Sequence, residues 1–227
     1  MLKKKLIFDV GMHKGEDTDF YLSKGFSVIA FEADPDLIKN SKIRFKSAIE
    51  DGSLVIVEGA IVDKNFDKKV RFYKNKQNTV WGTVLKEWAD RNEIDGAESE
   101  SIEVDSINFK EYLIKFGIPY YLKIDIEGMD IVCCEALLSF KQKPAYISIE
   151  SEKISFSKLE IEFNLFEKLG YEDFKIIQQE NIQKQKEKKL SKKNKFINYR
   201  FLEGSSGLFG DDLPGIWIDK QIALTKY

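Results

Sequence analysis

Cysteine and histidine are nearly absent from this chain of 227 residues. The two cysteines, Cys133 and Cys134, are adjacent, so they cannot bridge distant segments and they lack the spacing of a metal site. We expect both to be buried core thiols. The single histidine is His13, and no serine stands in a G-x-S-x-G motif. A disulfide-linked fold is thereby excluded, as is a hydrolase triad that is not centred on His13.

Long hydrophobic runs are missing as well. No stretch approaches the roughly 20 apolar residues that span a bilayer. The start MLKKKLIFDVG lacks the apolar core and the cleavage site of a secretion signal. We therefore expect a cytoplasmic protein without a membrane span.

A strong net charge is also lacking, because the formal value is −2 and nothing global attracts the chain to nucleic acid. The segment 183–195 is a local exception, with seven lysines against one glutamate. It is either a solvated insertion or a surface that attracts an anionic substrate or partner. No aromatic residues interleave with its lysines, which disfavours a nucleic-acid platform.

What the chain does contain is an ordinary globular composition, 43% hydrophobic and 33% charged. The length favours a single domain over residues 1–227. Two segments interrupt its regular pattern. A polar excursion near 75–101 predicts a substrate-side insertion with a short helix over 84–91, and the lysine-rich run marks a basic insertion near 180–200.

Short apolar segments alternate with helical ones along most of the chain. This alternation predicts an α/β fold, an open and mostly parallel sheet with helices on both faces. The expected strands cover residues 6–10, 26–33, 54–62, 70–73, 119–128, 145–150, 173–179 and 216–224. The expected helices cover 15–24, 106–116 and 158–168, together with a segment from Asp34 to Asp51. The apolar face of that last segment includes Ile49.

The stretch FDVGMHKGEDTDF forms the first turn from strand to helix, where a nucleotide-like cofactor sits in such sheets. Its spacing, Asp9-x-Gly11-x-x-x-Gly15, is not the G-x-G-x-x-G of dinucleotide sites. A pyrophosphate would be repelled by the acids Asp9, Glu16 and Asp17. S-adenosylmethionine carries an ammonium and a sulfonium but no phosphate, and Asp9 would favour both cations.

A second acid supports the same ligand. Glu32 ends the second expected strand, 17 residues after Gly15, where a carboxylate accepts the two hydroxyls of a ribose. Dinucleotide sites share this feature, so Glu32 indicates S-adenosylmethionine only in combination with the spacing of the first turn.

These segments carry a family resemblance. DVGMHKGEDTDFYLSKGFSVIAFEADP, YYLKIDIEGMD and YISIE resemble the FkbM family of S-adenosylmethionine-dependent methyltransferases. EGSSGLFGDDLPGIW and NTVWGT are similar to elements of one bacterial branch of that family. The resemblance implies a class I methyltransferase (Rossmann-like) fold with seven strands, the last antiparallel, and O-methylation of hydroxyls on sugars or other natural products. The cofactor-binding residues we expect are Asp9, Gly11, Met12, His13, Gly15, Thr18, Glu32, Ala33, Ala60 and Asp125.

Acidic residues follow two later strands and would meet over one cleft. Asp125, Glu127 and Asp130 follow the strand that ends near residue 124, and Glu150 and Glu152 follow the next. Asp125 or Glu127 could act as a general base whose pKa is raised by its neighbours. Alternatively, Asp125, Glu127 and Glu150 could hold Mg²⁺, which would acidify the acceptor hydroxyl. The clustering does not choose between these mechanisms, and we take these three residues as the catalytic candidates.

Three residues are candidates for binding the acceptor. His13 lies in the cofactor turn, Trp81 could stack on a sugar ring or on adenine, and Glu152 follows the strand with Glu150. Each has a plainer alternative in turn packing, loop anchoring or solvation. The glycine-rich segment 204–215 is either a lid over the cleft or an ordinary connection.

We therefore predict an S-adenosylmethionine-dependent O-methyltransferase that acts on a hydroxyl of a sugar, sugar nucleotide or polysaccharide precursor, with Mg²⁺ as an optional second cofactor. A nicotinamide-dependent oxidoreductase with an unusual turn, and an inactive cofactor-binding module of the same fold, are the alternatives. The expected partner is a small-molecule carbohydrate or sugar nucleotide, and neither nucleic acid nor a membrane is expected. The sequence does not determine the oligomeric state.

Overall fold

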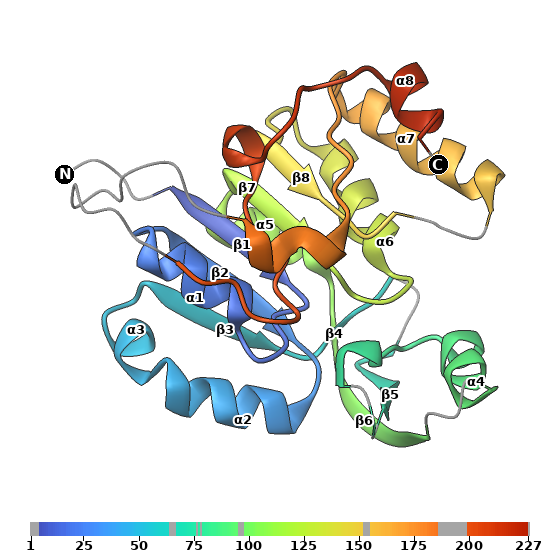
Figure 1. Ribbon diagram of the computed structural model, residues 1–227. Helices are drawn as coiled ribbons and strands as arrows, with labels where there is room; N and C mark the ends of the chain where they lie inside the picture. The colour runs from blue at the N-terminus through green and yellow to red at the C-terminus, as the bar shows by residue number, and fades with distance from the viewer. Residues whose placement is uncertain are drawn as a thin grey trace.

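The central sheet is built from five short, almost wholly apolar segments, as is typical of parallel strands that are buried on both faces. The computed structural model describes residues 5–63, 67–75, 77, 79–94, 98–151, 155–185 and 199–226. Its strands are β1 (Leu6–Val10), β2 (Ser27–Glu32), β3 (Leu54–Glu58), β7 (Tyr121–Ile124) and β8 (Tyr146–Ser148). They pair in parallel in the order β3-β2-β1-β7-β8 (Figure 1). The winding direction reverses between β1 and β7, so a ligand site is expected beyond the carboxyl ends of these two strands.

Helices cover both faces of this sheet and begin where the sequence supplies a cap. Gly15, with φ 82°, precedes the first helix, and the Asp34 carboxylate accepts the backbone N–H of Asp36 at 2.8 Å to cap the second. The helices are α1 (Glu16–Ser23), α2 (Pro35–Arg44), α3 (Lys46–Glu50), α5 (Phe109–Phe116), α6 (Asp130–Ala136), η2 (Leu137–Ser139) and α7 (Phe156–Leu169).

Alternate side chains of the strands pack into two hydrophobic cores, one on each face of the sheet. Phe8 and Val10 of β1 pack with α5, α6 and α7 on one face, and both cysteines are buried there as free thiols. Ile7 of β1 packs on the other face with residues of α1 and with Phe201 and Leu208 of the C-terminal segment. The predicted fold class, an α/β protein with a parallel sheet and helices on both faces, is confirmed.

A second, three-stranded sheet lies beside the carboxyl end of the first (Figure 1). The chain turns out of β3 at Gly59, where φ is 133° and an added Cβ would lie 2.4 Å from the Asp105 carbonyl oxygen. The strands β4 (Ala60–Ile61), β5 (Lys69–Asn75) and β6 (Ser99–Ile107) follow, with η1 (Thr79–Trp81) and α4 (Lys86–Ile94) between the last two. The excursion predicted near 75–101 is therefore largely the connection of an antiparallel β5–β6 pair.

Several sequence-based expectations need correction. The strand expected over 54–62 is two strands, and the helix expected over 106–116 starts at Phe109 because the preceding residues end β6. The helix that begins after Asp34 breaks at Phe45, and Ile49 is 36% exposed. At the C-terminus, an isolated antiparallel bridge between Phe174 and Ile218 stands where two strands were expected.

Short helical elements, rather than strands, occur in the described C-terminal part of the chain. The 3-10 turns η3 (Gln179–Lys184) and η4 (Gly210–Asp212) occupy the C-terminal part, and α8 (Lys220–Leu224) begins at a helix cap in which Asp219 accepts the N–H of Ile222. A seven-stranded sheet with an antiparallel last strand is therefore not confirmed for the described residues. Among those residues, no helix combines the length and the apolar composition needed to cross a bilayer.

Candidate functional site

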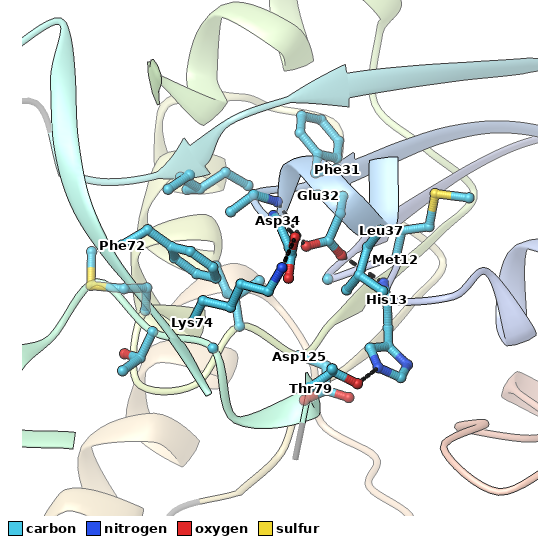
Figure 2. A pocket seen from close by; sticks show the side chains of 18 of the residues that line it. Met12, His13, Phe31, Glu32, Asp34, Leu37, Phe72, Lys74, Thr79 and Asp125 are labelled. Atoms are coloured by element: carbon cyan, nitrogen blue, oxygen red, sulfur yellow. Dashed lines mark hydrogen bonds and ion pairs between the residues drawn. The ribbon is translucent and has the colours of Figure 1, made fainter. Parts of the chain in front are cut away.

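A pocket opens at the switch point of the sheet, between the first turn and the second sheet (Figure 2). Its walls come from the β1–α1 turn, the end of β2, the β3–β4 corner, the β5–η1 segment and the end of β7. Seven predicted cofactor-binding residues line it: Gly11, Met12, His13, Glu32, Ala33, Ala60 and Asp125. Residues that the sequence reasoning missed line it as well, among them Leu37, Phe72, Lys74, Thr79 and Met129.

The turn after β1 brings two strand ends into contact. The backbone N–H groups of Gly11 and Met12 both donate to the Phe31 carbonyl, at 3.1 and 2.9 Å. Gly11 has φ 79°, and an added Cβ would lie 1.9 Å from the carbonyl oxygen of Asp125. Only glycine fits here, because both the backbone angle and the space exclude a side chain.

Glu32 forms the polar floor of the pocket (Figure 2). One of its carboxylate oxygens accepts the N–H of His13 at 2.7 Å, and the other accepts those of Ala33 and Asp34 at 2.9 Å each. Burial raises the pKa of Glu32, and these hydrogen bonds oppose the rise. The carboxylate is thus held in one orientation and joins the first turn to the end of β2.

Asp9, Gly15 and Thr18 do not line this pocket. Asp9 is fully buried behind the turn, where it accepts the Thr18 hydroxyl at 2.6 Å and lies 3.3 Å from the Lys123 ammonium. Gly15 packs against Phe45, where an added Cβ would lie 2.4 Å from the ring. These residues shape the turn, and the negative charge of Asp9 is compensated within the protein.

Lys123, which the sequence reasoning missed, is the centre of this buried cluster. Its Nζ donates to the Gly11 carbonyl at 2.6 Å and lies 3.9 Å from carboxylate oxygens of both Asp17 and Asp125. Burial opposes its charge, but the surrounding carboxylates, Asp9 foremost, raise the pKa of the ammonium above its ordinary value. The signal in the sequence was a lysine inside the apolar run YYLKI of a strand buried on both faces.

Acids gather beyond the end of β7, as predicted. Burial and the neighbouring charge of Glu150 raise the pKa of Glu127 to about 8, and burial beside Asp125 raises the pKa of Asp130 to about 7. Burial also raises the pKa of Asp125, although Lys123 opposes the rise. The structure thus brings Glu150 close enough for its charge to raise the pKa values of both Asp125 and Glu127. Glu152 lies outside the described residues.

The magnesium site is not supported by this arrangement. Among the described His, Cys, Asp and Glu residues, no group of three is disposed to hold a metal ion. Asp125, Glu127 and Glu150 do not form a preformed set of metal ligands in the described part of the chain.

Lys74 and Asn75 of β5 and Thr79 of η1 line the pocket on the side of the second sheet. Lys74 reaches inward and pairs with Asp34 at 3.1 Å and with Asp36, and His13 Nε2 lies 2.7 Å from the Thr79 hydroxyl (Figure 2). The space left inside is about 90 Å³, below the roughly 300 Å³ at the small end of ligand sites. A cofactor of nucleoside size must therefore displace Lys74 or move this segment.

The charge of the pocket favours a particular kind of ligand. Five carboxylates line it, from Glu16, Asp17, Glu32, Asp34 and Asp125, against two lysines, Lys74 and Lys123. Apolar side chains, including Leu37, Ile61 and Met129, form the rest of the wall. Such a lining suits a flat base, sugar hydroxyls and a cation, and it repels a pyrophosphate.

A second and larger cavity of about 1020 Å³ lies between β8, α7 and the C-terminal segment. Glu150 lines it, and Asp125 is the one described residue that borders both cavities. Trp81 lines neither cavity.

Two further segments were singled out in the sequence. The segment 204–215, a candidate lid, is anchored by Phe209, whose ring stacks on that of Tyr121 with the ring centroids 4.1 Å apart. Most of the lysine-rich run 183–195 lies outside the described residues.

Comparisons with known proteins bear on these observations. No curated protein and no solved structure matches the chain. The family model described as the methyltransferase FkbM domain matches residues 9–174, which include the first turn, Glu32 and the acids after β7 and β8. The chain thus belongs to the FkbM methyltransferase family.

Proposed function

We propose that this protein is an S-adenosylmethionine-dependent O-methyltransferase that acts on a hydroxyl group of a sugar, sugar nucleotide or polysaccharide precursor. The observation that carries the proposal is the acid-rich pocket at the switch point, in which Glu32 and Asp125 face a partly apolar wall. A nicotinamide dinucleotide is the poorer fit, because five carboxylates against two lysines oppose its pyrophosphate.

The residues of the pocket fit S-adenosylmethionine group by group. Leu37, Ile61 and Met129 would hold the adenine, and Glu32 would accept a ribose hydroxyl with the one lone pair that its three backbone partners leave on Oε2. Asp125, beside the Gly11 turn, would favour the cationic methionyl end. When bound, this cofactor supplies a methyl group on a positively charged sulfur.

The chain itself must orient the acceptor hydroxyl and remove its proton. Asp125 suits the second task because it borders both cavities and burial raises its pKa. Glu150 lines the second cavity, and its charge helps to raise the pKa values of Asp125 and Glu127. We propose Asp125 as the general base, with burial and the charge of Glu150 raising its proton affinity above that of an ordinary aspartate.

Two measurements test the proposal. Calorimetry should detect binding of S-adenosylhomocysteine and no comparable binding of NAD. Transfer of a labelled methyl group to a panel of sugars and sugar nucleotides should then occur, and Asp125→Asn should abolish it while the variant remains folded. Absence of heat with S-adenosylhomocysteine, or wild-type turnover by Asp125→Asn, would contradict the proposal. Repeating the transfer with EDTA determines whether a metal takes part.

A further inference from the structure

We infer that the second cavity is the acceptor site and that it takes an uncharged sugar ring, with Trp217, Tyr146 and Asp211 as its recognition group. The inference rests on the proposed function and narrows its substrate class. It sets neutral glycosides apart from nucleotide diphosphate sugars.

The position of the cavity makes it the acceptor side. Asp125 borders it and the cofactor pocket alike, so a molecule in each would meet at that carboxylate. Its volume of about 1020 Å³ is large enough for a sugar or short oligosaccharide. Ser148 and Glu150, at the end of β8, stand on the same wall near this junction.

An aromatic group with fixed geometry also lines this cavity. The Trp217 and Tyr146 rings lie 6.0 Å apart and almost parallel, at 13°. Asp211 holds both, since it accepts the Tyr146 hydroxyl at 2.8 Å and the Trp217 indole N–H at 3.3 Å. Lys175 lies 4.5 Å from the Trp217 ring and donates to the Leu213 carbonyl at 3.0 Å. The indole is thus oriented by its neighbours, and 36% of Trp217 remains exposed.

This combination suits a carbohydrate. The C–H groups of a sugar ring carry slight positive charge and pack on the electron-rich face of an indole or phenol. The hydroxyls of the ring need carboxylate and hydroxyl partners such as those of Asp211, Glu150 and Ser148. An acceptor that is oriented at both ends in this way presents one hydroxyl to Asp125.

The charge of the cavity selects against phosphate. Seven carboxylates line it against two lysines, Lys175 and Lys226, among the described residues. A nucleotide diphosphate sugar would bring two further negative charges into this field, which disfavours its binding. A neutral sugar meets no such penalty.

Calorimetric titration of the full-length protein tests the inference with defined probes. The probes are the methyl glycosides of glucose, galactose, mannose and rhamnose, with UDP-glucose and catechol for comparison. At least one glycoside should bind, and more tightly than UDP-glucose or catechol. Trp217→Ala should weaken that glycoside about tenfold or more, and Trp217→Phe should restore part of the loss. The matched control is Ile216→Ala, because Ile216 is 80% exposed and does not line the cavity.

The inference is overturned if no glycoside binds, if UDP-glucose or catechol binds more tightly, or if Trp217→Ala has no larger effect than Ile216→Ala. Asp211→Asn is a second variant should Trp217→Ala fail to fold, and it should also weaken the glycoside. S-adenosylhomocysteine should bind every folded variant with the wild-type Kd. Since the glycoside titrations do not need the cofactor, failure of S-adenosylhomocysteine to bind would count against the proposed function alone.

Discussion

The ammonium of Lys123 lies 3.3 Å from a carboxylate oxygen of Asp9 in the interior of the protein, and both side chains are almost completely shielded from water. Carboxylate oxygens of Asp17 and Asp125 each lie 3.9 Å from the same ammonium. The buried lysine therefore compensates carboxylates from β1, α1 and the end of β7, the elements that enclose the cofactor turn. This arrangement explains how an acid-rich site forms without the acids forcing the turn apart.

Lys123→Met should lower the free energy of unfolding by about 3 to 5 kcal/mol, because it leaves Asp9 buried without its cation. Urea denaturation at neutral pH measures the change. The matched control is Lys42→Met, which breaks an ion pair with Glu58 in which both side chains are about half exposed. It should cost less than about 1 kcal/mol. Equal losses in the two variants would contradict the role assigned to Lys123.

Gly11→Ala should abolish binding of S-adenosylhomocysteine, because the new Cβ would lie 1.9 Å from the Asp125 carbonyl oxygen and force the turn away from β7. Gly52→Ala is the control for backbone strain alone. Gly52 has φ 73°, close to the 79° of Gly11, but no atom stands within 4 Å of an added Cβ. It should cost about 1 to 2 kcal/mol of stability and leave the Kd unchanged. Calorimetry gives the Kd values, and wild-type affinity in Gly11→Ala is the contrary result.

Glu32→Gln should weaken binding of S-adenosylhomocysteine by about 10- to 100-fold. The amide cannot accept all three backbone N–H groups and the ribose as well, and a hydrogen bond to a charged group contributes about 1.5 to 3 kcal/mol. Glu58→Gln is the matched control, since Glu58 is the register partner of Glu32 on β3 but does not line the cofactor pocket. Calorimetry gives the Kd of S-adenosylhomocysteine for each variant. Similar Kd values for Glu32→Gln and Glu58→Gln would show that Glu32 does not bind the cofactor.

The stability of the protein should fall as the pH rises from about 5 to 8.5. Burial and Glu150 raise the pKa of Glu127 from 4.5 to about 8. In this range the unfolded chain has released the proton that the folded protein still holds, so unfolding releases a proton and becomes more favourable with rising pH. Glu127→Gln should remove roughly 2 to 4 kcal/mol of that fall.

Urea denaturation of wild type and Glu127→Gln at pH 5 and 8.5 measures this difference. The control is Glu103→Gln, at an exposed position of β6, which should keep the wild-type pH dependence. A Glu127→Gln protein whose stability falls as steeply as that of the wild type would show that Glu127 ionises normally in the folded state.

The alternation of apolar segments with capped helices was enough to predict the parallel sheet. The strand at Leu6–Val10, the cap at Asp34 and the helix stop at Gly170 depend on neighbours in sequence, so they could be assigned without the tertiary structure. The pairing of β5 with β6 could not, because β6 is polar along most of its length and its sequence pattern does not mark a buried strand.

The candidate site divides in the same way. The residues at the switch point could be named from local spacing alone, since Gly11, Glu32 and Asp125 lie at or next to strand ends that must meet at one edge of a parallel sheet. Three other features follow from the folded chain and not from local spacing: Lys123 compensates the charge of Asp9, Lys74 and Thr79 line the pocket from the side of a second sheet, and Trp217 lines a separate cavity. Some of these contacts, such as that of Lys123 with Asp9, join segments more than a hundred residues apart in the sequence. Long-range packing, rather than local spacing, therefore determines which charges and rings meet.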